Sequence, residues 1–140
     1  MKPVVIDASF ALALVLPDES STAAERLVRS AAAGEVRLLT AGLWPIEMAN
    51  GLLQAARRRR IATQDRLIAH DFLLGLPVTV ADEQIPASVL FTLADEERLT
   101  VYDVCYLALA IERGARLATT DSPLRKAARR HSLLWQSSAR

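Results

Sequence analysis

The stretch Val4-Val5-Ile6-Asp7-Ala8-Ser9 decides the fold, because it is an apolar run that ends abruptly on a carboxylate. A short run rich in β-branched residues predicts a buried strand, and Asp7 lies where that strand stops. Three more acids occupy comparable places further along the chain, and they are Glu47, Asp103 and Asp121. The remaining sequence is interpreted as the scaffold that brings these four acids together.

Strand and helix patterns alternate through the chain. Strands are predicted at residues 4–6, 36–40, 78–81 and 116–119, with a further edge strand at 133–135. Helices are predicted at residues 9–16, 22–34, 46–60, 63–74, 86–97 and 100–113, and a last helix begins at 122. This alternation predicts a three-layer α/β/α fold, with a central, mainly parallel sheet of four to five strands and helices on both faces.

Several local signals fix the predicted helix starts and faces. Ser9, Thr63 and Ser122 are the expected N-caps, and Thr22 opens a stretch with capping-box spacing. Pro123 suits the first position of a helix, which makes Ser122 the cap and leaves Asp121 free. Apolar spacing predicts one face on each of two helices: Ile46, Ala49, Leu53 and Ala56 on the third, and Val104, Leu107, Ala108 and Ile111 on the sixth.

The composition is that of one ordinary globular domain. The chain has 140 residues, of which 51% are hydrophobic and 24% charged, and its net charge of +1 identifies no class of partner. We expect a single domain over residues 1–135 and a polar, fraying tail over 136–140. The single cysteine excludes an intrachain disulfide. The absence of a signal-peptide pattern and of a long apolar stretch adds to the expectation of a cytoplasmic protein.

The four acids are predicted to share one crevice. Ligands of parallel sheets gather at the carboxyl ends of the strands, and Asp7 and Asp121 follow two of those ends. Glu47 and Asp103 lie in the first turns of helices that begin on the same side. Clustered carboxylates repel one another unless a hard cation such as Mg²⁺ or Mn²⁺ compensates them, and such a site can activate water toward a phosphoryl group.

Each acid also has a purely structural explanation. Asp7 could begin the turn into the following helix, and Glu47 could complement a helix dipole. Asp103 fits a capping box with Thr100, and Asp121 competes with Ser122 for a cap. Four such explanations meeting on one rim are a weaker account than one shared site.

The ordered set of motifs resembles the PIN-domain ribonucleases, specifically the VapC toxin type of bacterial and archaeal toxin–antitoxin pairs. The matching pieces cover essentially the whole chain: Val5-Ile6-Asp7-Ala8-Ser9, Glu47, Leu99-Thr100-Val101-Tyr102-Asp103-Val104-Cys105-Tyr106-Leu107-Ala108-Leu109-Ala110, and Leu117-Ala118-Thr119-Thr120-Asp121-Ser122-Pro123-Leu124.

The resemblance implies a site and a reaction. By resemblance, Asp7, Glu47, Asp103 and Asp121 bind the metal ion, Mg²⁺ or Mn²⁺, and Ser9 and Thr119 support them through hydrogen bonds. Some relatives carry another polar or acidic group just after the last acid, where this chain has Ser122 and Pro123. The number of metal ions, one or two, is therefore left open. The implied reaction is hydrolysis of RNA by metal-activated water, which leaves a 5′-phosphate and a 3′-hydroxyl.

The resemblance also implies partners. They are an RNA substrate, a VapB-like antitoxin that covers the acidic crevice, and a second copy in a homodimer. The apolar surface of the second to fourth helices is the expected antitoxin groove. Arg57, Arg58, Arg59, Arg60 and Trp44 are candidate contacts to RNA or to a partner, with a solvated helix end and burial as the respective alternatives.

Other side chains receive structural interpretations. Arg125, Lys126, Arg129 and Arg130 are expected on a solvated helix face, and Cys105 in the core. His70 and His131 belong to no motif and are expected at the surface or at an interface.

Two further function classes compete with the nuclease. The first is a PIN-like binding module without activity, which the presence of all four acids disfavours. The second is an aspartate-based phosphotransfer protein, either a phosphatase of the haloacid-dehalogenase type or a receiver domain. The phosphatase needs an acid where Ser9 stands, and the receiver needs an early acidic pair and a late lysine that this sequence does not show.

Overall fold

The sheet at the centre of the molecule has four strands, all parallel, in the order β3-β2-β1-β4. In this computed structural model, which describes residues 2–19 and 21–137, they are β1 (Pro3–Ile6), β2 (Arg37–Thr40), β3 (Val78–Val80) and β4 (Arg116–Ala118). Strand β1 lies in the middle, where Val5 pairs with Leu39 on one side and Leu117 on the other. A strand buried on both faces favours a continuous apolar sequence, which is what Val4-Val5-Ile6 provides.

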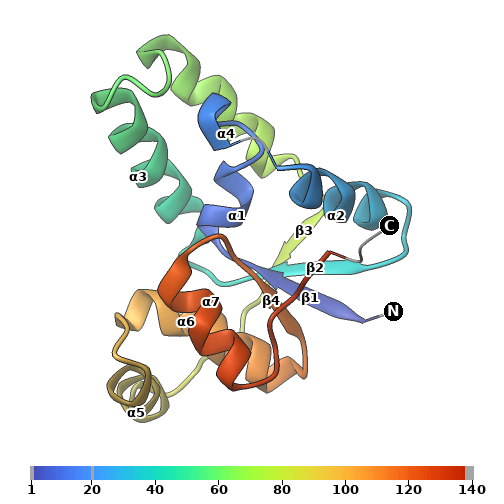
Figure 1. Cartoon of the computed structure of the whole chain (residues 1–140), viewed down its shortest axis with the longest axis vertical. Coiled ribbons are helices and arrows are strands. Elements are labelled where there is room, and N and C mark those ends of the chain that lie inside the picture. The colour runs from blue at the N-terminus through green and yellow to red at the C-terminus, as the bar shows by residue number, and fades with distance from the viewer. Residues whose placement is uncertain (1, 20, 138–140) are drawn as a thin grey trace.

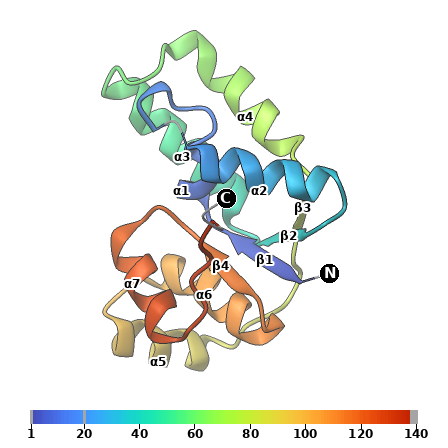
Figure 2. The ribbon, with the colours of Figure 1, turned by 45° about the vertical axis from the view of Figure 1, so that its right-hand side comes forward.

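Helices cover both faces of this sheet. They are α1 (Ala8–Leu12), α2 (Thr22–Ala32), α3 (Trp44–Arg57), α4 (Arg66–Leu74), α5 (Ala87–Glu97), α6 (Val101–Arg113) and α7 (Ser122–Arg130), with short 3₁₀ turns η1 (Pro17–Glu19) and η2 (Thr63–Asp65). Figures 1 and 2 show α1 to α4 on one side of the strands and α5 to α7 on the other. The predicted three-layer α/β/α fold with a parallel sheet is confirmed.

The core lies between these layers and is mostly aliphatic. Val5, Leu117, Met48, Leu107 and Leu124 are completely buried and represent the sheet and the helices on its two sides. Helix α1 packs closely on α3 at Gly51, where an added Cβ would lie 2.4 Å from Leu12 Cδ1. This close approach holds α1, which directly follows β1, against the middle of α3.

The predicted face of α3 was wrong in phase. Its buried residues are Trp44, Met48, Leu52 and Ala55, whereas the side chain of Ile46 is 74% exposed. The large Trp44 ring enters the core at the first helical position and thereby sets the rotation of the helix. On α6, Val104, Leu107 and Ala108 are buried as predicted, but Ile111 is 45% exposed.

Three predicted caps were also wrong. Asp7, not Ser9, caps α1, and this helix already ends at Leu12. Asp121, not Ser122, caps α7, because its carboxylate accepts from Leu124 N. Thr63 begins η2 and makes no side-chain cap. For α1 and α7 an aspartate one or two residues earlier in the chain provides the cap, and for α4 no side chain does.

The remaining differences lie at the ends of the second helix and of the chain. The cap of α2 is Ser21, whose Oγ accepts from Ala24 N. The edge strand predicted at 133–135 is reduced to one parallel bridge between Leu117 and Leu134. Of the predicted tail at 136–140, residues 138–140 lie outside the described residues. Within the described part of the chain, no helix combines the length and apolarity needed to cross a membrane.

Candidate metal site at the carboxyl edge of the sheet

The structure brings the four predicted acids to the carboxyl ends of the strands. Asp7 directly follows β1, and Asp121 follows β4 by three residues, while Glu47 and Asp103 lie in the first turns of α3 and α6. Charge repulsion connects them in a series: Asp121 raises the pKa of Asp7 and of Asp103, and Asp103 raises the pKa of Glu47. In each case burial is the larger cause of the raised pKa.

Asp7 is the most deeply held of the four, with only 4% of its surface exposed. Its Oδ1 accepts from Phe10 N at 2.9 Å and from Ser9 Oγ at 2.8 Å, and its Oδ2 accepts from Thr119 Oγ1 at 2.5 Å. These hydrogen bonds favour the charged form, but burial outweighs them and raises the pKa of Asp7 to about 6.

A network of hydroxyl groups joins the end of β1 to the end of β4. Ser9 Oγ and Thr119 Oγ1 lie 3.2 Å apart, Thr120 N donates to Ser9 Oγ, and Asp121 N donates to Thr119 Oγ1. The guanidinium of Arg125 donates to the carbonyl of Thr119 at 3.1 Å, so this arginine lies beside the site and not on a purely solvated face. Ser9 and Thr119 therefore contact Asp7 and fix the segment that carries Asp121.

Tyr106 is a site residue to which the sequence analysis gave no role. Its hydroxyl donates to Glu47 Oε1 at 2.6 Å, and the side chain is 1% exposed. Burial and the Glu47 carboxylate raise the pKa of Tyr106 far above its usual value, so the phenol stays protonated. The signal was present in the sequence, because Tyr106 stands three residues after Asp103 and so on the same side of the helix.

Trp44 is buried at 3% exposure, and its Nε1 donates to the carbonyl of Asp7 at 3.2 Å. The ring is therefore not available to stack on a base, and that candidate role is corrected to a structural one. It supports the peptide that carries Asp7, at the junction between β1 and α1.

Asp103 and Cys105 lie near each other at the start of α6. Asp103 is half-buried, and its backbone N donates to the capping hydroxyl of Thr100 at 3.1 Å. Burial, followed by the charge of Glu47, raises the pKa of the Cys105 thiol, so it is a poor nucleophile.

The donor chemistry of the site suits a hard divalent cation, since it consists of carboxylate oxygens whose charges repel. Across residues 2–19 and 21–137, however, no three acidic, histidine or cysteine side chains converge in the arrangement of a finished metal site. The carboxylate oxygens of Asp7 accept hydrogen bonds from Ser9, Phe10 and Thr119. The four acids fit such an ion by the chemistry of their carboxylates and by their place at the carboxyl ends of the strands.

The four arginines at the end of α3 differ in their contacts. Arg60 binds Asp18 at 2.8 Å and Glu19 at 2.7 Å, which ties η1 to the helix end. Arg57, Arg58 and Arg59 are exposed. Neither histidine contacts any of the four acids in the described part of the chain: His70 contacts the carbonyl of Pro45, and His131 contacts Glu97.

Comparison with known proteins agrees with this geometry. The PIN-domain family matches residues 4–130. The chain is 35% identical over 125 residues to a protein of Pyrobaculum aerophilum named Ribonuclease VapC3, covering 86% of this chain and 91% of that one. Its fold is similar to the crystal structure of PAE2754 from Pyrobaculum aerophilum, with a TM-score of 0.69 and 26% identity over 90% of this chain and 79% of the other. Each match spans nearly the whole described structure, so the chain belongs to the PIN-domain family and, within it, to the VapC type.

Proposed function

We propose that this chain is a metal-dependent endoribonuclease and the toxin of a type II toxin–antitoxin pair. The observation that carries the proposal is the location of four acids from four distant segments at the carboxyl edge of one sheet, where their charges act on one another in pairs. The similarity to a protein named Ribonuclease VapC3 supports both the choice of RNA as substrate and the toxin role.

Each side chain has a defined part in this proposal. Asp7, Glu47, Asp103 and Asp121 would hold Mg²⁺ or Mn²⁺, which when bound supplies charge neutralisation at phosphate and lowers the pKa of a water molecule. Ser9 and Thr119 orient the Asp7 carboxylate, and Tyr106 orients Glu47. The products would carry a 5′-phosphate and a 3′-hydroxyl.

The test is cleavage of RNA by the purified protein and by two aspartate variants. We expect Mn²⁺ or Mg²⁺ to support cleavage and a chelator to abolish it. Asp103→Asn should lower the rate by at least about 100-fold, because it removes one of the charges that hold the ion. Asp95→Asn on α5 is the matched control, since Asp95 is exposed and lies outside the acid site. Undiminished cleavage by Asp103→Asn, or cleavage in chelator, would contradict the proposal.

The partner proposed for the toxin is an antitoxin whose apolar segment lies along α3 and α4. These packed helices expose four large apolar side chains: Ile46 at 74%, Leu67 at 69%, Ile68 at 69% and Phe72 at 55%. An exposed patch of this kind marks an interaction surface. We further propose that the toxin is cytoplasmic and that it forms a homodimer. Sedimentation of the purified protein tests the homodimer.

Ile68→Glu tests the antitoxin surface. A charge in the middle of the patch should weaken capture of the co-expressed antitoxin by at least about tenfold, because a carboxylate would be desolvated at the interface. RNA cleavage by the free toxin should be unchanged, since the side chain of Ile68 is 69% exposed and is not one of the four acids or their hydrogen-bond partners. Co-purification of Ile68→Glu with antitoxin at the normal ratio would place the interface elsewhere.

A further inference from the structure

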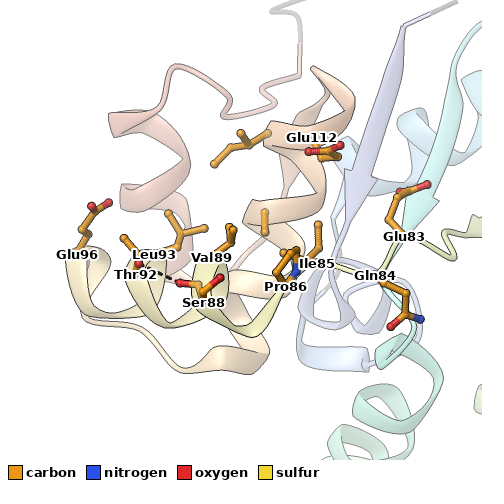
Figure 3. A pocket seen from close by; sticks show the side chains of 12 residues that line it. Glu83, Gln84, Ile85, Pro86, Ser88, Val89, Thr92, Leu93, Glu96 and Glu112 are labelled. Carbon is orange, nitrogen blue, oxygen red and sulfur yellow. Dashed lines mark hydrogen bonds between the residues drawn. The ribbon is translucent and has the colours of Figure 1, made fainter.

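A cavity lies between α5, α6 and the segment that leads into α5, and none of the four acids lines it (Figure 3). Its volume is about 530 Å³, within the range of ordinary ligand pockets. Apolar side chains make most of its surface: Ile85, Val89, Leu93, Ala108 and Ile111. Val89 and Ile111 are large apolar residues that remain 47% and 45% exposed, so the cavity offers apolar surface to an occupant.

The charged residues that line this cavity are all acidic. Glu83, Glu96 and Glu112 are among its lining residues, and no lysine, arginine or histidine is. Arg113 binds Glu83 Oε1, but Glu83 Oε2 is buried and accepts no hydrogen bond within the described part of the chain. Glu96 and Glu112 are exposed. An occupant is therefore favoured if it brings positive charge next to an apolar group.

This combination discriminates among occupants. Nucleic acid is disfavoured because its phosphates would face the carboxylates of Glu96 and Glu112. A second copy docked by this cavity about a twofold axis would place the same acidic rim against itself, which costs free energy. A peptide segment with apolar side chains flanked by basic ones can pack against the apolar lining of the cavity and pair its cations with the acidic lining residues.

We propose that the cavity between α5 and α6 is a docking site for a basic segment of a partner polypeptide, which inserts apolar side chains between Val89 and Ile111 and places its cations against Glu96 and Glu112. The site is separate from the acid cluster, so it allows the toxin to be bound or localised without blocking the proposed chemistry.

The experiment measures binding of a fluorescein-labelled peptide to the full chain by anisotropy at low salt. The probe has two central leucines flanked on each side by two arginines. One control peptide replaces the arginines by glutamates, and another replaces the leucines by alanines. Glu96→Gln with Glu112→Gln should weaken binding of the basic probe at least about fivefold, and Val89→Ser should do the same. Asp95→Asn with Glu25→Gln removes two acids outside the cavity and should leave the dissociation constant within about twofold.

Four results of the peptide measurement would overturn the proposal, and a fifth would come from sedimentation. They are no saturable binding of the basic probe, equal binding of the acidic peptide, equal binding of the alanine peptide, or equal loss in the control double variant. Sedimentation of the same variants supplies the remaining comparison. A change in self-association caused by Glu96→Gln with Glu112→Gln would assign the cavity to a second copy instead. Circular dichroism and thermal unfolding confirm that each variant is folded, and RNA cleavage should be unaffected by all of them.

Discussion

Asp7 combines a structural role, as the cap of α1, with its proposed role as a metal ligand. Its carboxylate caps α1 and accepts hydroxyl hydrogen bonds, yet burial raises its pKa to about 6. Between about pH 4 and pH 6 the folded chain therefore holds a proton that the unfolded chain has released. Stability must fall as the pH rises through that window, by about 3 kcal/mol at most.

Asp7→Asn should remove this pH dependence in metal-free buffer. An asparagine can still accept from Phe10 N, and the hydroxyls of Ser9 and Thr119 can rotate to accept from its amide, so the fold is retained. Urea unfolding of both proteins from pH 4 to 7 gives the difference curve directly. The variant should become the more stable protein toward pH 7. A constant difference across the range would show that the buried charge has no such cost.

Tyr106 offers a second test at the level of one atom. Tyr106→Phe removes only the hydroxyl that donates to Glu47, which should lower the free energy of unfolding by about 1 kcal/mol. If Glu47 is held for metal binding, Mn²⁺ affinity measured by calorimetry should also fall at least about tenfold. Tyr102→Phe on the same helix is the matched control, since Tyr102 is 65% exposed. A loss of stability with normal Mn²⁺ affinity would limit Tyr106 to packing.

At the scale of elements, two of the four acids are also helix caps. Asp121 accepts from Leu124 N at the start of α7, so its replacement affects a helix as well as a charge cluster. Asp121→Asn and Asp121→Ala separate these roles, because asparagine caps well and alanine does not. We expect the alanine variant alone to lose about 1 kcal/mol of stability in urea titrations, whereas RNA cleavage falls in both. Cleavage retained by Asp121→Asn would reduce Asp121 to a cap.

The sequence was sufficient for the elements that local chemistry determines. The apolar run before Asp7 and the alternation of patterns predicted the parallel sheet, and the four acids were placed at its carboxyl edge. The sequence was insufficient where a contact between distant residues determines the structure. The rotation of α3 follows from Trp44 entering the core, and the choice between Asp121 and Ser122 follows from the Thr119 network. The cavity between α5 and α6 also depends on how these helices pack, so no local sequence pattern predicts it.

At the scale of the whole molecule, a net charge of +1 hides a strong separation of charges. The acids lie at the carboxyl edge of the sheet, and Arg57, Arg58 and Arg59 lie at the far end of α3, which begins beside Glu47. At the helical rise, Glu47 and Arg57 are roughly 15 Å apart along the axis. A single-stranded RNA bound with one phosphate at the acids could extend along α3 and place another near these arginines.

Replacing Arg57, Arg58 and Arg59 together by alanine tests this extended path. On an Asp103→Asn background, which prevents cleavage, the affinity for a single-stranded oligonucleotide should fall, and the slope of log K against log salt should become shallower by about 2, because each lost phosphate contact removes about 0.7. The matched control replaces three other exposed cations, Lys2, Arg29 and Arg37, by alanine and so removes the same amount of charge. Lys2 and Arg37 lie at the amino ends of the strands, on the opposite edge of the sheet from the four acids. This control should change the slope little. Equal slopes for the two triple variants would mean that only overall charge matters, whereas a selective effect would make α3 the element that joins substrate binding to the acids.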